Sequence, residues 1–349
     1  MALVRPAALA AGDTVSVVSP SSGAASAFPW LLERAERNLK VHLGLSIKEL
    51  PHTRSKPKFL ERHPEARAAD LEQAFEDPET TAVFATIGGD DSVRVLPHLD
   101  RSLFRKHPKI LMGFSDTTTL TTWGNLQGLV TFNGPSLLAG WAQMEKFPPP
   151  FLDLTRSLLF DAASPIELYP FAHYSEGYPD WSVKTNLGKV NQLSENEGPH
   201  WVRGKQAFEG PLFGGCLEVL EFLKGTEFWP EKDFWKGKVL FLETSEEVPS
   251  LKEVRRWLRN YGVQGVFDQV AGLLFGRARG YTPQQKTELD STILEVLTNE
   301  FHQGDLPVVT NLDFGHTDPQ WILPLGVKLS VDPRLRRFVL TEPATRRTR

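Results

Sequence analysis

The sequence predicts an α/β fold with two domains, and three observations support this prediction. The chain has 349 residues, which corresponds to about two domains of ordinary size. In the first half, short β-branched runs alternate with segments of helical periodicity, a pattern typical of a parallel sheet covered by helices. The second half resumes this alternation and ends in two short hydrophobic runs, which favours a mixed sheet.

The first domain is expected to span residues 1–165. Its first strand lies in the run DTVSVVSP at 13–20, and the helix that follows at 30–43 is closed by Gly44. Further strands are expected at 46–50, 82–87, 110–112 and 130–132, and helices at 64–75 and from Ser92 through Leu96. Because parallel sheets bind ligands beyond the carboxyl ends of their strands, the turns after the third and fourth strands are expected to face one crevice.

The alternation of predicted strands and helices stops between the two halves of the chain. Residues 171–209 contain many Gly, Asn, Ser and Pro residues together with Trp181 and Trp201, and they show little periodicity. We expect an insertion at 166–210, built as a long loop or a hairpin, because long loops with aromatic residues in enzymes are often lids or binding loops. A linker without a binding role is the alternative.

The second domain is expected at 211–349. Ser250 and Glu253 form a capping box at the start of one helix, and Thr282-Pro283 opens another. The expected helices lie at 217–224, 251–261 and 283–301, and the expected strands at 239–242, 270–275, 308–310, 327–331 and 338–340.

Composition narrows the class of partner. The formal charge is −4 without a block of like charges, which favours a small molecule or peptide over nucleic acid or a membrane surface. The single cysteine, Cys216, excludes an intrachain disulfide and is expected to be a buried structural residue rather than a nucleophile. Arg5-Pro6 interrupts the apolar run near the N-terminus, so no signal peptide is expected, and no segment is apolar enough to span a membrane. A cytoplasmic protein is therefore expected.

The candidate nucleophile is Ser115, in the stretch ILMGFSDTT. A buried strand ends at Gly113, and the turn that follows can expose the serine hydroxyl next to free N–H groups of a starting helix. The hydrolase motif G-x-S-x-G is incomplete, since Thr117 stands where its second glycine would be, so a serine that merely caps the helix is the alternative. Gly88, Gly89 and the N–H of Asp116 are candidate oxyanion donors.

Two further residues would complete a catalytic triad. Glu243 follows a predicted strand, and His316 lies in a loop after the last strand of the parallel series. Serine needs an imidazole to accept its proton, and the imidazole needs a carboxylate to fix its tautomer. Glu246 and Glu247 compete with Glu243 for the role of the acid, and each of the three residues could also be an ordinary surface or turn residue.

Other chemistries have weaker support. The chain lacks the H-E-x-x-H zinc motif, a Cys/His cluster, the P-loop and the G-x-G-x-x-G fingerprint. Asp90, Asp91 and Asp116 could hold a divalent cation, but the adjacent glycines and serine turn favour hydrolysis.

Six motifs resemble the LD-carboxypeptidase family of serine peptidases, in order and in approximate spacing. They are TIGGDDS at 86–92, GFSDTT at 113–118, FNGP at 132–135, FGG at 213–215, LFLE at 240–243, and GH at 315–316 followed by LPLG at 323–326. The resemblance implies an N-terminal parallel-sheet α/β domain with the nucleophile, a C-terminal mixed α/β domain with the acid and base, a site in the cleft between them, and a homodimer. It also implies Ser115 as nucleophile, His316 as base, Glu243 as acid, Gly89 and Asp116 as oxyanion donors, and no metal or organic cofactor.

Within this family the sequence looks more similar to the branch of microcin C self-immunity peptidases than to the murein-recycling branch. The reasons are the motif TIGGDDS and the long insertion before Phe213. The resemblance then implies cleavage of an amide bond near the C-terminal end of a small peptide conjugate, a peptidyl- or aminoacyl-nucleotide. Gly88 and Asp90 are expected to bind substrate, and Trp181 is expected to stack on the nucleobase, with Phe171 or Tyr174 as a second platform. The alternatives are a murein tetrapeptide carboxypeptidase, a non-catalytic ligand-binding protein with the same cleft, and an unrelated ester hydrolase.

Overall fold

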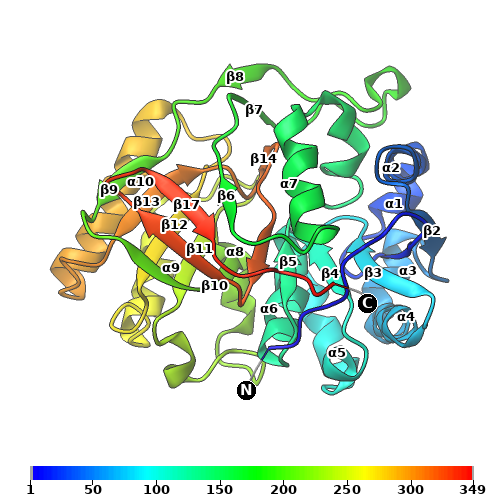
Figure 1. Cartoon of the computed structure of the whole chain (residues 1–349), viewed down its shortest axis with the longest axis horizontal. Coiled ribbons are helices and arrows are strands. Elements are labelled where there is room, and N and C mark those ends of the chain that lie inside the picture. The colour runs from blue at the N-terminus through cyan, green and yellow to red at the C-terminus, as the bar shows by residue number, and fades with distance from the viewer. Residues whose placement is uncertain (1–2, 348–349) are drawn as a thin grey trace.

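The computed structural model describes residues 3–347 and contains three sheets. The N-terminal half, in blue and cyan in Figure 1, lies beside the C-terminal half, in yellow, orange and red. Each half is built around its own large sheet, and the strand ends that carry the candidate site residues meet between them. This arrangement confirms the predicted fold class, a parallel-rich α/β half followed by a mixed α/β half.

The first sheet has the strand order β15-β5-β4-β3-β1-β2. The five strands from the N-terminal half are all parallel: β1 (Thr14–Val18), β2 (Ser46–Glu49), β3 (Thr80–Ala85), β4 (Ile110–Gly113) and β5 (Thr131–Asn133). The sixth strand, β15 (Leu323–Leu325), comes from the C-terminal half and pairs antiparallel with β5. No strand was expected at 323–325, so the sequence did not reveal this connection between the halves.

The second sheet has the strand order β6-β17-β16-β10-β11-β12-β13-β9. Its centre is a parallel set formed by β10 (Phe208–Cys216), β11 (Val239–Glu243), β12 (Gly272–Gly276) and β13 (Val308–Leu312). Antiparallel strands flank this set: β16 (Lys328–Asp332), β17 (Arg337–Leu340), β6 (Ile166–Leu168) and β9 (His200–Arg203). The expected mixed sheet is therefore confirmed.

The helices expected at 30–43, 64–75, 217–224, 251–261 and 283–301 are present with small shifts at their ends, whereas those at 24–27, 57–62, 103–106 and 149–159 were not expected. Together these helices cover the sheets. They are α1 (Ala24–Ala27), α2 (Pro29–Leu43), α3 (Pro57–Arg62), α4 (Pro64–Glu76), α5 (Leu103–Lys106), α6 (Thr118–Leu126), α7 (Pro149–Leu159), α8 (Leu217–Leu223), α9 (Leu251–Val263) and α10 (Pro283–Glu295). Gly44 ends α2 in a left-handed conformation, and both predicted capping boxes are present. Two expected helices differ: 92–98 is a 3₁₀ helix with Pro97 inside it, and α10 continues as a π turn at 296–300.

The expected insertion forms short strands with an excursion between them. β7 (His173–Glu176) pairs antiparallel with β8 (Leu193–Glu195), and β14 (Thr317–Asp318) pairs with β7 on its other side. Residues 177–192 leave this small sheet and return to it, and the backbone oxygen of Trp181 accepts a hydrogen bond from Trp30 Nε1 in α2. The excursion is thereby attached to the N-terminal half while both its ends belong to a sheet shared with the His316 loop.

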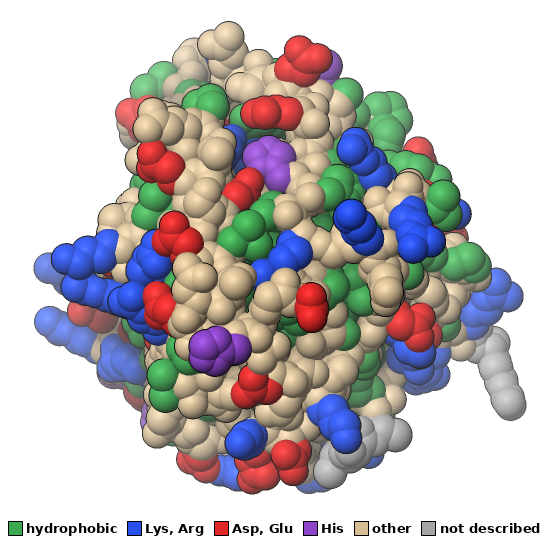
Figure 2. Space-filling view, turned by 90° about the vertical axis from the view of Figure 1, so that its left-hand side faces the viewer, with side chains coloured by type: hydrophobic (Ala, Val, Ile, Leu, Met, Phe, Trp, Pro, Cys, Tyr) green, Lys and Arg blue, Asp and Glu red, His purple; other side chains and the backbone are tan. Residues whose placement is uncertain are grey.

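Charges of both signs are interspersed on the surface. Figure 2 shows acidic and basic side chains mixed over one face, with hydrophobic side chains between them. Cys216 is buried, as expected, and burial raises the pKa of its thiol well above the usual value. Within residues 3–347, no helix is long and apolar enough to cross a membrane.

Candidate active site

Ser115 occupies a strained turn directly after β4. Phe114 separates it from the strand, and Ser115 starts a 3₁₀ turn that runs into α6. Its φ is 59°, in the left-handed region that non-glycine residues rarely adopt and that often marks a functional position. A side chain on Gly88 would place its Cβ only 2.8 Å from Ser115 Oγ, so the absence of a side chain there leaves room for the hydroxyl.

Glu243 and His316 form a buried pair. Glu243 is the last residue of β11, and His316 lies in the loop between β13 and β14. His316 Nδ1 and Glu243 Oε2 are 2.7 Å apart. The loop reaches this position through Gly315, which has φ 99° and whose Cβ, if present, would lie 2.7 Å from the same carboxylate oxygen. The sequence prediction that Glu243 contacts His316 is therefore reproduced in the geometry.

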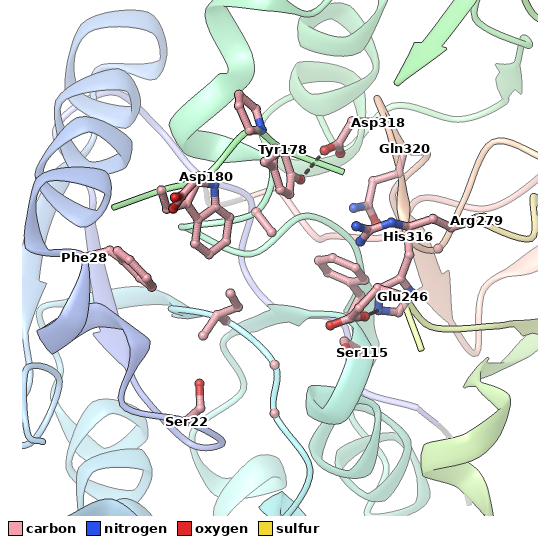
Figure 3. Close-up of a pocket in the computed structure, with 18 residues that line it drawn as sticks. Ser22, Phe28, Ser115, Tyr178, Asp180, Glu246, Arg279, His316, Asp318 and Gln320 are labelled. Carbon is pink, nitrogen blue, oxygen red and sulfur yellow. Dashed lines mark hydrogen bonds and ion pairs between the residues drawn. The ribbon is translucent and has the colours of Figure 1, made fainter. Parts of the chain in front are cut away.

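Ser115 and His316 line one cavity of about 480 Å³. The ring of Phe114 contacts the His316 ring edge-on with centroids 5.0 Å apart, which links the serine turn directly to the histidine loop. Figure 3 shows Ser115, Glu246, His316 and Arg279 on one side of the cavity, with Phe28 and Asp180 on the other. The lining residues are Ser22, Phe28, Ile87, Gly88, Gly89, Phe114, Ser115, Ala139, Tyr178, Pro179, Asp180, Trp181, Glu246, Arg279, Gly315, His316, Asp318 and Gln320.

The glycine loop after β3 is tied to the serine turn. Ser92 N donates to Asp116 Oδ2 at 2.9 Å, and Ser92 Oγ donates to the backbone oxygen of Asp116 at 2.7 Å. The Asp116 carboxyl is fully buried, which raises its pKa, and it serves as an acceptor that holds the loop. Gly88 and Gly89 line the cavity, whereas Asp90 is exposed and is absent from its lining.

A second clamp holds the same loop from behind. The fully buried guanidinium of Arg67 donates to the backbone oxygens of Pro20 and Ser21 and forms an ion pair with Asp91 at 2.6 Å. Asp91 is therefore engaged by an arginine rather than free to bind a cation. Within residues 3–347, no group of three or more His, Cys, Asp or Glu side chains is arranged to hold a metal ion.

Aromatic residues form the end of the cavity opposite the serine. The Trp181 ring lies 5.5 Å from Phe28 and 5.4 Å from Tyr178, measured between ring centroids. The two other candidate platforms are elsewhere: Phe171 and Tyr174 are buried outside this cavity, and Tyr174 packs under the Arg277 guanidinium at 4.0 Å. The expectation that one of them would be a second platform beside Trp181 is wrong, and Phe28 and Tyr178 occupy that place.

Both nitrogens of His316 face carboxylates. Glu246 Oε2 lies 3.0 Å from His316 Nε2, on the side opposite the Nδ1–Glu243 bond. Burial disfavours the imidazolium, but the charge and hydrogen bond of Glu243, followed by Glu246, outweigh burial and raise the pKa of His316 to about 10. Pairing with His316 lowers the pKa of Glu246 to about 2.

Tyr178 and Asp318 form a second polar pair in the cavity, beside His316 and Glu246. Tyr178 donates its hydroxyl hydrogen to Asp318, as the dashed line in Figure 3 marks. Burial raises the pKa of Asp318 to about 6, and burial together with the Asp318 charge keeps the pKa of Tyr178 well above its usual value. The buried amide of Gln320 lines the cavity beside this pair, and its interaction with Asp318 opposes the rise in the pKa of that carboxyl.

Sequence reasoning missed several residues of this cavity. Arg279 follows β12 by three positions, so the same search for polar residues past strand ends could have found it. Tyr178, Asp318 and Gln320 carried no such signal, because their placement depends on the excursion at 177–192 and on the turn after β14. Glu246 was considered only as a rival for the role of Glu243, and its position at the other nitrogen was not expected.

A strained serine on a strand-to-helix turn that shares a cavity with a carboxylate-bound histidine is the arrangement of a serine hydrolase. Comparison with known proteins agrees. Family models for the LD-carboxypeptidase N-terminal domain and C-terminal domain match residues 15–134 and 209–331. The chain therefore belongs to the LD-carboxypeptidase family of serine peptidases.

Curated relatives include a microcin self-immunity protein and a probable murein peptide carboxypeptidase, and similar solved structures include MccF and an MccF-like protein. The microcin C7 self-immunity protein MccF of Escherichia coli is 31% identical over 79% of this chain and 78% of its own length. A probable murein peptide carboxypeptidase of Bacillus subtilis is 31% identical over 96% of this chain and 94% of its own. An MccF-like protein from Streptococcus pneumoniae, solved in complex with AMP, superposes with a TM-score of 0.84 at 31% identity, covering 95% of this chain and 99% of that one. MccF in complex with aspartyl sulfamoyl adenosine superposes with a TM-score of 0.84 at 28% identity, covering 98% and 100%.

Proposed function

We propose that this serine peptidase cleaves an amide bond near the C-terminal end of a small peptide conjugate, a peptidyl- or aminoacyl-nucleotide, through Ser115, His316 and Glu243. The observation that carries the proposal is one cavity with the serine and histidine at one end and the aromatic residues Phe28, Tyr178 and Trp181 at the other. An acyl group at the serine and a nucleobase between the aromatic rings would use both ends at once.

The reaction starts with attack of Ser115 Oγ on the carbonyl carbon, while the hydroxyl proton moves to His316 Nε2. Glu243, bonded to Nδ1, fixes the tautomer of the imidazole and stabilises the imidazolium that forms. The tetrahedral intermediate expels the amine, which takes the proton from Nε2, and an acyl group remains on Ser115. Water then attacks this ester with His316 again accepting a proton, and the acid product leaves.

The negative oxygen of the intermediate needs hydrogen-bond donors. We assign this role to the backbone N–H groups of Gly89 and Asp116, because the glycine loop lines the cavity and the turn at Asp116 is fixed by Ser92. Preorganised donors of this kind contribute about 10²–10³-fold in rate. Gly88 provides space for the serine hydroxyl, and Asp90 has no assigned contact with the substrate.

Trp181 is the residue proposed to stack on the nucleobase. Base stacking on an aromatic side chain is worth about 1–3 kcal/mol, so Trp181→Ala should raise KM for a nucleotide conjugate about 5- to 150-fold. Hydrolysis of a substrate without a base should change little. The solved relatives in complex with AMP and with aspartyl sulfamoyl adenosine support a nucleotide-containing ligand.

The experiment that tests the proposal offers the enzyme two substrates, an aspartyl-adenylate analogue and a murein tetrapeptide, and identifies the products by mass spectrometry. We expect cleavage of the analogue, and no cleavage of either substrate by Ser115→Ala. Cleavage of the tetrapeptide alone would contradict the nucleotide substrate. Unchanged turnover by Ser115→Ala would remove Ser115 from the mechanism.

A murein tetrapeptide carboxypeptidase is the second candidate. It is favoured by the Bacillus subtilis relative, which matches nearly the whole chain at the same identity as MccF matches a smaller part. The catalytic steps would be the same, and only the group that leaves would differ. The two-substrate experiment distinguishes the candidates.

A further inference from the structure

Glu246 contacts the nitrogen of His316 that would act as the general base. In the reaction proposed above, the proton of Ser115 moves to His316 Nε2, and that nitrogen lies 3.0 Å from a Glu246 carboxylate oxygen. This contact is an ion pair that pairs the second nitrogen of the ring, as Glu243 pairs the first. An imidazole with a carboxylate at each nitrogen is held as the imidazolium, and an imidazolium has no lone pair to accept a proton.

The contact between His316 and Glu246 can be broken more easily than the contact between His316 and Glu243. Glu243 is fully buried at the end of a strand, whereas the Glu246 side chain is 53% exposed. It lies in the connection between β11 and α9, near Val248, whose φ is 53°. Within residues 3–347 the Glu246 carboxylate forms an ion pair with His316 alone, so its departure breaks one ion pair.

Arg279 offers Glu246 a second place in the same cavity. Both side chains line the cavity, and Arg279 forms no ion pair under 4 Å with any described residue. After the hydrogen bond and charge of His316, the charge of Arg279 also helps to keep the pKa of Glu246 low. Figure 3 shows both side chains on the same side of the cavity as His316.

We infer that Glu246 is a removable block on the general base: paired with His316 Nε2 it holds the enzyme inactive, and when substrate fills the cavity it moves to Arg279 and frees that nitrogen. The inference rests on the proposed roles of Ser115 and His316. When Glu246 leaves, the Nε2 proton passes to water in the cavity, and the neutral imidazole keeps its Nδ1 hydrogen on Glu243. Glu246 thus acts through His316 and not on the substrate.

Several elements around His316 carry charged or titratable groups that face it. Glu243 lies on β11, Glu246 on the loop after it, Arg279 after β12, Asp318 on β14, and Tyr178 on the excursion that covers Asp318. Of these groups, Glu243 and Glu246 contact the imidazole. Removing the charge of Glu246 is therefore expected to lower the pKa of His316 from about 10, while Glu243 continues to orient the ring.

The test measures first the titration of His316 and then the reactivity of Ser115. In protein labelled with ¹³C-histidine, the His316 signal is assigned by its loss in His316→Asn and followed from pH 5 to 11. We expect Glu246→Gln and Glu246→Ala to lower the titration midpoint by at least about one unit. Each unit raises the unprotonated fraction at pH 7 about tenfold, so labelling of Ser115 by a fluorophosphonate at pH 7 should be at least about tenfold faster. Glu247→Gln, the same charge change one residue along and outside the cavity lining, should change neither quantity.

Arg279 is tested by a double-mutant cycle. Arg279→Gln should lower kcat/KM for the cleaved substrate, and this loss should disappear in the Glu246→Gln background, where no carboxylate needs a second partner. Losses that add independently would overturn the role of Arg279. An unchanged His316 midpoint in both Glu246 variants, or an equal shift in Glu247→Gln, would overturn the block itself.

The failure of this inference can be told apart from failure of the proposed function. If Ser115→Ala is labelled as fast as wild type, Ser115 is not the activated nucleophile and the proposed mechanism fails. If only wild-type Ser115 is labelled and the Glu246 variants behave like wild type, the mechanism stands and the block is refuted. The titration in a Ser115→Ala background reports the block without any activity.

Discussion

Single residues determine whether the Ser115 hydroxyl is positioned to act as a nucleophile. The left-handed backbone of Ser115 and the bare backbone of Gly88 form one contact, because a Cβ at position 88 would lie 2.7 Å from the Cβ of the serine. Real Cβ atoms do not approach so closely, so one of the two segments would have to move. The position of Ser115, the proposed nucleophile, therefore depends on a residue from the neighbouring strand end.

Gly88→Ala should lower kcat at least about 100-fold, the loss typical of a displacement of about 1 Å at the reacting atom, with a smaller change in KM. Steady-state kinetics with the cleaved substrate measures this loss. Gly304→Ala is the control, because its added Cβ meets no atom within 4 Å, and it should leave both constants unchanged. Full activity in Gly88→Ala would mean that the serine turn tolerates displacement.

The charge on His316 also affects stability as pH changes. Its pKa is about 10 in the folded state against the usual histidine value of 6.5, so the folded state binds the proton more tightly. This contribution to stability is complete below about pH 6.5 and is lost as pH rises through about 10. The stability advantage of wild type over Glu246→Gln should therefore shrink between pH 8 and 10.5, as urea unfolding followed by tryptophan fluorescence would measure. The difference between wild type and Glu247→Gln should stay constant with pH.

The sequence predicted part of this site for a physical reason. Ser115 and Glu243 each follow a strand of a parallel set, and parallel sheets bind ligands beyond the carboxyl ends of their strands. Their strands belong to different sheets, so the meeting of the two strand ends depends on how the halves pack, which local sequence does not reveal. The place of Glu246 follows from a rotamer and a loop path, neither of which leaves a periodic signal. Trp181 was predicted from the resemblance alone, and its neighbours Phe28 and Tyr178 come from separate segments that only the fold brings together.

At the scale of elements, the connection from β11 to α9 carries both the candidate acid, Glu243, and the proposed block on His316, Glu246. Glu243 ends the strand, Glu246 follows in the loop, and Ser250 caps the helix with Glu253. Ser250 Oγ accepts from Glu253 N, and Ser250 N donates to the Glu253 carboxylate at 2.7 Å. The capping box therefore fixes where the flexible part of the loop ends.

Ser250→Ala should lower the free energy of unfolding by about 1 kcal/mol, the usual cost of losing a side-chain cap. Urea unfolding measures it. Ser291→Ala, on the exposed side of α10 and outside any cap, should cost less than half as much. A larger effect at Ser291 than at Ser250 would contradict the role of the capping box.

Strong periodicity made most elements predictable, and its absence explains the rest. The buried strands β4 and β11 are continuous apolar runs, and α2 and α9 have clear apolar faces and caps. By contrast, β8 is exposed along its length, and β15 contains a proline and only three residues. Such strands are defined by their partners, which local sequence does not reveal.

At the scale of the molecule, the two halves are interleaved. β15 joins the first sheet from the C-terminal half. In the second sheet, β6 and β9, both labelled in Figure 1, come from the middle of the chain. Segments near the two ends of the chain also pair, since Ala8 N donates to Arg346 O and Arg346 N donates to Pro6 O. The boundaries at 165 and 210 and the homodimer stay predictions, which limited proteolysis and sedimentation can test.

The interleaving predicts that the halves unfold together. Because β15 forms an edge of the first sheet, unfolding the second half removes a strand and its buried Leu323 and Leu325 from the first. We expect one cooperative transition, with the same midpoint by far-UV circular dichroism and by tryptophan fluorescence. Two separate transitions would show that the halves are energetically independent.

The crossing of β15 also has a consequence for biosynthesis. Strands β5 and β15 are partners but lie about 190 residues apart, so the nascent N-terminal sheet emerges from the ribosome with one edge unpaired. That edge stays open while nearly all of the C-terminal half is translated, at about 5–20 residues per second. For tens of seconds, each new chain therefore exposes an aggregation-prone edge that only its own last segments can cover.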